Sequence, residues 1–188
     1  LLLRRRLPNA AHKQASALAS ANSAKINLST RPFLLLLGIA GISCCVAMSM
    51  PQVHIVSYCV GLGYGPAVGV QMLSVMLLGG VVSRIVSGLI ADRLGGIKTV
   101  LLGASLQCIA LVMYLPFDGM ISLYVVSLVF GLSQGGIVPG YAVIVREYLP
   151  PREAGEQVGF VMMMTILGMA FGGWMSGWIY DLTSSYQL

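Results

Sequence analysis

The sequence predicts an all-α membrane protein with five transmembrane helices, and three observations support this class. Hydrophobic residues make up 57% of the 188-residue chain and charged residues only 9%, whereas roughly a quarter of an ordinary soluble domain is charged. Four long segments contain no Asp, Glu, Lys or Arg: residues 32–83, 99–117, 119–145 and 157–180. In the resulting topology, all basic residues outside the predicted spans fall on one side of the membrane. One further basic residue lies inside a span.

The uncharged segments set the number of membrane crossings. A helix rises about 1.5 Å per residue, so about 20 apolar residues cross a hydrocarbon core about 30 Å thick. The first segment must cross twice, and its break is the turn GLGYGP at 61–66, where glycines and a proline disfavour helix. We therefore expect spans near residues 33–58, 67–91, 98–116, 119–144 and 157–180. The spans are apolar on every side, as helices in lipid are, and do not alternate as strands do.

The placement of Lys and Arg predicts an orientation, because these residues concentrate in cytoplasmic loops. They precede the first span or separate the second from the third and the fourth from the fifth: Arg4, Arg5, Arg6, Lys13, Lys25, Arg31, Arg93, Lys98, Arg146 and Arg152. We expect a basic cytoplasmic loop over residues 1–31, a transmembrane bundle over residues 32–188, and an external C-terminus, in the plasma membrane or bacterial inner membrane. The same bias explains the net charge of +5, so no nucleic-acid partner is expected.

The sequence shows no pattern of an enzyme, a metal site or a cofactor site. Cys44, Cys45, Cys59 and Cys108 lack the spacing of zinc ligands. The GLGYG string lacks the preceding strand of a dinucleotide site. The spans contain no paired carboxylates and no nucleophile with its base. We expect neither a metal nor a cofactor.

Small residues predict where helices pack closely. Glycines recur at small-xxx-small spacing in the last two spans, at Gly131, Gly135, Gly136, Gly140, Gly168, Gly172, Gly173 and Gly177. Helices in lipid associate by close packing, so such stripes mark helix–helix contacts. Pro139 is expected to bend the fourth span, and Pro51 to kink the first.

The loop after the second span resembles a known signature. SGLIADRLGGIKTVLL, residues 87–102, is similar to the loop G-x-x-x-D-R-x-G-x-x-K of the major facilitator superfamily, with a departure at Gly96. The matching residues are Gly88, Asp92, Arg93, Gly95 and Lys98. The resemblance implies a conformational latch in which glycine lets two helix ends approach and the aspartate accepts hydrogen bonds from a helix N-terminus.

Two further segments extend this resemblance. REYLPPREAGEQVG resembles the connection between the tenth and eleventh helices of the family, and GGWMSGWIYDLTSSYQ resembles the end of the eleventh. The chain would then be a partial C-terminal bundle, helices seven to eleven of twelve. Its implied partners are the bilayer and a missing N-terminal half of six helices.

Arg84 is the one charged residue inside a span, about eight residues or 12 Å from the predicted cytoplasmic end. Burial of an arginine there costs at least about 2.5 kcal/mol. The spacing of Arg84, Gly88 and Asp92 resembles the eighth helix of monocarboxylate transporters and oxalate/formate antiporters, where the arginine meets an anionic substrate. Two alternatives stay open: Arg84 reaches the headgroups, or it pairs with Asp92.

The resemblance to these two branches is incomplete. Gly80 stands where monocarboxylate transporters have an aspartate, and residues 157–180 lack the lysine of the antiporters. The chain has no carboxylate inside a span, so proton coupling cannot be argued from it.

The other predicted substrate contacts are His54, Tyr58, Gln134 and Tyr141, with Gln52 on the same family surfaces. His54 could hydrogen-bond a substrate or titrate near neutrality, or serve structure alone.

The leading functional hypothesis is a secondary active carrier of a small organic anion such as a monocarboxylate, working by alternating access. The alternatives are a truncated fragment or interaction subunit that transports nothing, and a carrier of a non-anionic solute. A membrane-embedded enzyme is disfavoured by the missing catalytic groups.

Overall fold

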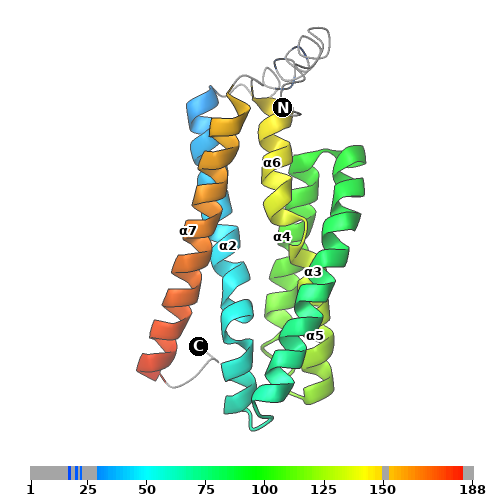
Figure 1. Ribbon diagram of the computed structural model, residues 1–188, viewed down its shortest axis with the longest axis vertical. Helices are drawn as coiled ribbons and strands as arrows, with labels where there is room; N and C mark the ends of the chain where they lie inside the picture. The colour runs from blue at the N-terminus through cyan, green and yellow to red at the C-terminus, as the bar shows by residue number, and fades with distance from the viewer. Residues whose placement is uncertain (1–16, 18–19, 21, 23–28, 150–152, 184–188) are drawn as a thin grey trace, which may run out of the picture.

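The computed structural model describes residues 17, 20, 22, 29–149 and 153–183. Most of the predicted basic loop over residues 1–31 therefore lies outside the described residues. The helices are α2 (Thr30–Gly61), α3 (Pro66–Leu94), α4 (Gly96–Met113), α5 (Met120–Gln134), α6 (Ile137–Tyr148) and α7 (Ala154–Thr183) (Figure 1).

The predicted class is confirmed, because the described residues contain five helices long and apolar enough to cross a membrane. They are α2, α3, α4, the pair α5–α6, and α7. Successive crossings run in opposite directions, and α2 and α7 lie side by side along the bundle (Figure 1).

Glycines in left-handed conformations make the tight connections. Gly63 and Gly65 have φ of 84° and 82°, which L side chains rarely adopt, and Pro66 then begins α3 with its fixed φ. Gly95 has φ of 85° and separates α3 from α4 without an intervening loop. At the opposite end, the Tyr64 hydroxyl donates to the carbonyl of Asp118 at 3.0 Å. This bond joins the α2–α3 turn to the α4–α5 connection.

Two close helix pairs form the bundle: α2 packs mainly on α7, and α3 mainly on α5. A Cβ at Gly168 of α7 would lie 2.6 Å from the carbonyl oxygen of Ile42 on α2. A Cβ at Gly131 of α5 would collide with the carbonyl oxygen of Met76 on α3. These glycines let the backbones approach, as the small-residue spacing predicts.

The fourth crossing is interrupted between α5 and α6. Gly135 and Gly136 form the break, and Gly135 packs directly against the backbone at Gly80 of α3. Pro139 follows in the first turn of α6 and has no N–H to bond the carbonyl of Gly135. The irregularity expected at Pro139 therefore begins four residues earlier. Pro51, by contrast, lies within the single helix α2.

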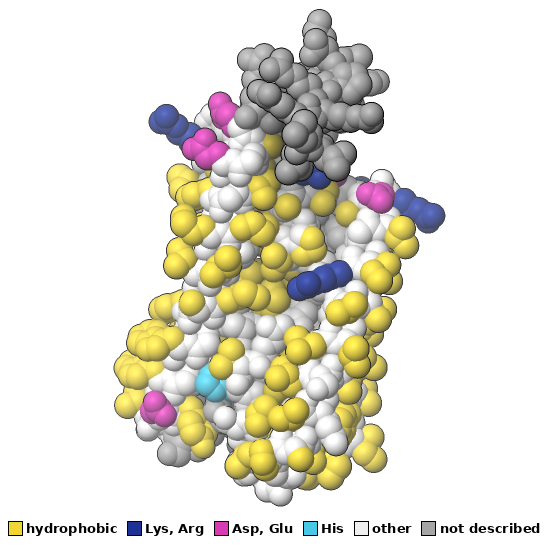
Figure 2. All heavy atoms as spheres, in the orientation of Figure 1, with side chains coloured by type: hydrophobic (Ala, Val, Ile, Leu, Met, Phe, Trp, Pro, Cys, Tyr) yellow, Lys and Arg dark blue, Asp and Glu magenta, His cyan; other side chains and the backbone are white. Residues whose placement is uncertain are grey.

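The outer surface is apolar along most of its length (Figure 2). Large side chains such as Ile121 and Leu115 are 81% and 72% exposed, and others from α2, α3, α4, α5 and α7 are at least half exposed. Exposure of such an apolar surface to water is unfavourable, whereas lipid solvates it. The described residues thus have the surface of an integral membrane protein.

Candidate functional site

Arg84 lies on α3 with an exposed side chain, far from both ends of the helix. Its backbone nitrogen packs near Gly135, where a Cβ would approach it to 3.0 Å. Figure 2 shows one basic side chain between the two ends of the visible face, whereas the other charged side chains lie near the ends. Within the described part of the chain, Arg84 and Asp92 do not form an ion pair.

Gln134 ends α5 beside this position. It is only 4% exposed, and its Oε1 accepts a hydrogen bond of 2.8 Å from Nε2 of Gln52 on α2. Its own Nε2 is directed towards α3, 3.9 Å from where a Cβ of Gly80 would be. Because Gly80 precedes Arg84 by one helical turn, Gln134 and Arg84 belong to the same part of the α3–α5 contact.

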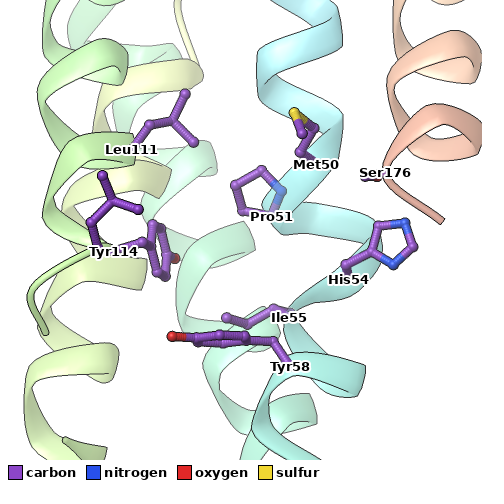
Figure 3. Close-up of a pocket in the computed structure, with 9 residues that line it drawn as sticks. Met50, Pro51, His54, Ile55, Tyr58, Leu111, Tyr114 and Ser176 are labelled. Atoms are coloured by element: carbon purple, nitrogen blue, oxygen red, sulfur yellow. The ribbon is translucent and has the colours of Figure 1, made fainter. Parts of the chain in front are cut away.

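His54 and Tyr58 line a separate cavity of about 380 Å³ between α2, α4 and α7. The residues that complete it are Met50, Pro51, Ile55, Leu111, Tyr114, Leu115 and Ser176. Figure 3 shows the ring of Tyr58 pointing from α2 towards Tyr114, which follows the end of α4, while His54 points towards α7. None of the described residues that line this cavity is an Asp, Glu, Lys or Arg.

The imidazole of His54 packs against α7 at Gly173 and Gly177, which have no side chains. Its Nε2 lies 3.0 Å from the carbonyl oxygen of Gly173 and therefore acts as the donor, and Cε1 would be 3.5 Å from a Cβ at Gly177. The glycine spacing of α7 thus serves this side chain as well as the α2 backbone.

Tyr141 lies elsewhere, on α6. It is 2% exposed and packs in a hydrophobic cluster with Phe33, Leu37 and Ile144. A solute could touch it only after α6 had moved. The described structure places the five predicted contacts apart: Arg84 lies near Gln134, His54 shares a cavity with Tyr58, and Tyr141 packs in a hydrophobic cluster.

The loop between α3 and α4 departs from the expected roles. Asp92, Arg93 and Lys98 are exposed, and a Cβ at Gly88 would meet nothing within 4 Å. The close approach occurs instead at Gly96, where a Cβ would lie 2.8 Å from Ile144. Gly88 therefore does not bring helix ends together in the described residues.

The carboxylate at the N-terminus of α4 is Glu147, from the end of α6. Its Oε2 accepts from the backbone N–H of Gly96 at 2.9 Å. An anionic acceptor is favourable there, because it satisfies an unpaired N–H and complements the helix dipole. No local sequence pattern indicates this role, which was expected of Asp92, because Glu147 lies 51 residues from Gly96 along the chain.

Replacing Glu147 with Ala is expected to destabilise the protein by about 1 kcal/mol, the usual effect of losing an N-terminal cap. Glu147→Gln keeps an acceptor oxygen and should lose less than half of this. Thermal unfolding in detergent, followed by helical circular dichroism, measures both. Equal stability of the Ala variant and the wild type would show that the contact contributes nothing.

Among the described residues, no group of three His, Cys, Asp or Glu side chains could hold a metal. All four cysteines are free thiols. The polar groups described above can bind and orient a solute by hydrogen bonds and, at Arg84, by charge.

Known proteins with similar sequences are membrane carriers by name. A family model described as Major Facilitator Superfamily matches residues 1–173. Monocarboxylate transporter 13 of Rattus norvegicus is 25% identical over 139 residues, which are 73% of this chain and 32% of the relative. Probable anion transporter 6 of Oryza sativa subsp. japonica is 33% identical over 103 residues, 54% of this chain and 24% of the relative.

A third relative, an agnestins efflux protein of Paecilomyces divaricatus, is 24% identical over 139 residues, 73% of this chain and 32% of its own length. The chain spans about a third of the length of the first curated relatives that it matches, 32% and 33%. No solved structure gives a significant match.

Proposed function

We propose that this chain, which belongs to the Major Facilitator Superfamily, forms part of a secondary active carrier for a small organic anion. The single observation that carries the proposal is Arg84, an exposed charged side chain well inside α3, where no other charged residue occurs between Pro66 and Ala91. A guanidinium is costly at such a depth and binds carboxylates bidentately. Two of the relatives are named as monocarboxylate and anion transporters, which supports the same class.

The proposed mechanism is alternating access. A second half of six helices would close the face that bears Arg84, and rocking of the two halves would expose the arginine to each side in turn. The loop at Gly88, Asp92, Arg93, Gly95 and Lys98 would hold one of these states by its contacts at the end of the bundle.

The proposed orientation places this loop in the cytoplasm of a cell with the carrier in its plasma membrane or bacterial inner membrane. By the alternation of the crossings, Arg31, Arg93, Lys98 and Arg146 share one end of the bundle with the loop, and the α2–α3 turn lies at the other. This asymmetry fits the preference of Lys and Arg for cytoplasmic ends.

A carrier of a neutral solute is the second candidate, and the uncharged cavity favours it. The polar residues that line it, His54, Tyr58, Tyr114 and Ser176, carry no formal charge, and each already has a partner within the protein. In that case Arg84 would serve the assembly of the carrier, not substrate binding.

Uptake of labelled propanoate and of propanamide into proteoliposomes distinguishes the two candidates. The carrier that contains this chain should take up the anion and discriminate against the neutral amide by at least about tenfold, the effect of losing a charge-assisted pair. Liposomes with the 188-residue chain alone test whether five helices suffice. Preference for the amide would reject the anion assignment.

A further inference from the structure

An amide bridge crosses the bundle next to Arg84. Gln52 and Gln134 are 82 positions apart and come from α2 and α5, which do not pack along each other. Both side chains could instead have been apolar, as most of their neighbours are. A buried amide is stable only when its polar groups find partners, so the bridge specifies a particular arrangement at this point.

The direction of the hydrogen bond between the two amides determines which atom of the Gln134 amide remains available to a ligand. Its Oε1 is occupied by the Nε2 donor of Gln52. Among the described residues, the buried polar atoms without a partner are Oε1 of Gln107 and Oε1 of Gln157. The amide nitrogen of Gln134 is not one of these buried atoms and has no hydrogen-bond partner among the described residues, so it keeps some accessible surface.

This NH₂ group lies on the same side of α3 as the arginine. It sits beside Gly80, which precedes Arg84 by four residues or about 6 Å along the helix axis. Helical side chains lean towards the N-terminus and cover the preceding turn. An anion held by Arg84 would therefore extend over Gly80, where the Gln134 donor is.

We propose that Gln134 is a specificity-determining residue that donates to an acceptor atom of the substrate beyond its carboxylate, and that Gln52 is the positioning residue that holds it. The inference rests on the proposed anion site at Arg84. With Oε1 turned towards Gln52, the group that Gln134 directs towards α3 is the NH₂ donor. A substrate without an acceptor leaves the NH₂ unpaired, and an unpaired buried donor is penalised more than an added bond is rewarded.

The test compares transport of 2-oxopropanoate with that of propanoate, which differs by the missing oxygen. The carrier that contains this chain is expected to prefer 2-oxopropanoate by about five- to tenfold in kcat/KM, as one such hydrogen bond gives. Gln134→Leu should lower the ratio of the two kcat/KM values to about one. Gln52→Leu should lower it in the same direction, because the amide is then free to turn.

The double variant and a matched control separate positioning from general damage. If Gln52 acts through Gln134, the double Leu variant should equal Gln134→Leu, since the two effects are not additive for a coupled pair. Gln71→Leu removes a glutamine of α3 that is bonded to Tyr124 and not to the bridge, and should keep the full preference.

The outcomes distinguish this inference from the proposed function. Transport that depends on Arg84, with the same preference in Gln134→Leu as in the wild type, overturns the role of the bridge alone. Additive losses in the double variant overturn the positioning role of Gln52. Wild-type protein that transports neither carboxylate overturns both proposals together.

Discussion

Replacement of Arg84 by Gln is expected to lower anion uptake about a hundredfold while the protein still inserts and folds. Truncating one partner of a desolvated charge pair typically costs about 2–5 kcal/mol, and about 2.7 kcal/mol corresponds to a hundredfold loss. Folding should be spared because the side chain is exposed in the described residues and the backbone contact to Gly135 is unchanged. Initial rates of labelled propanoate uptake in proteoliposomes measure the loss.

Two further substitutions refine this expectation. Arg84→Lys keeps the charge but loses the bidentate fork, so an intermediate loss of about tenfold is expected. Arg31→Gln removes an exposed charge at the start of α2 and should leave uptake unchanged. Uptake by Arg84→Gln at the wild-type rate would remove the basis of the anion assignment.

Replacement of Gly131 by Ala should destabilise the bundle, although the same change usually favours a helix. The added methyl group would collide with the Met76 carbonyl oxygen, which is backbone and cannot rotate away. Overpacking of this kind costs about 1–3 kcal/mol and occasionally more. Thermal unfolding in detergent should show a lower midpoint, with less folded protein recovered from membranes.

Gly159→Ala is the matched control, since Gly159 lies within α7 with nothing within 4 Å of a Cβ. There the restricted unfolded chain should raise stability by about 0.5–1 kcal/mol. The two variants therefore differ in sign. Equal effects at both positions would mean that the α3–α5 contact tolerates a wider separation.

The helices of this protein can be predicted from local composition. The neighbour that each side chain contacts cannot. An uncharged run must form a helix in lipid, so the crossings and the turn GLGYGP could be predicted. Gly131 and Gly168 could be assigned to helix contacts because their spacing has one main use in membranes. Which helix each meets depends on the packing of the whole bundle.

Tyr141 illustrates this limit. The resemblance predicts a substrate contact at Tyr141, and in the described residues its ring is buried against residues from the start of α2. No local sequence pattern marks Glu147 or Gln52, because their hydrogen-bond partners lie 51 and 82 positions away along the chain, respectively. Arg84 was detectable because a lone charge in an apolar span has few purely structural uses.

The break at Gly135 and Gly136 gives the two parts of one crossing different neighbours. α5 packs on α3 through the glycine contacts, α6 packs on α7, and both pack on α4. A displacement of α7 relative to the bundle would therefore act on α6 directly and reach α5 through the two glycines and through α4. The fourth crossing thus consists of two helices that could turn relative to each other at the break, and the break lies beside Arg84.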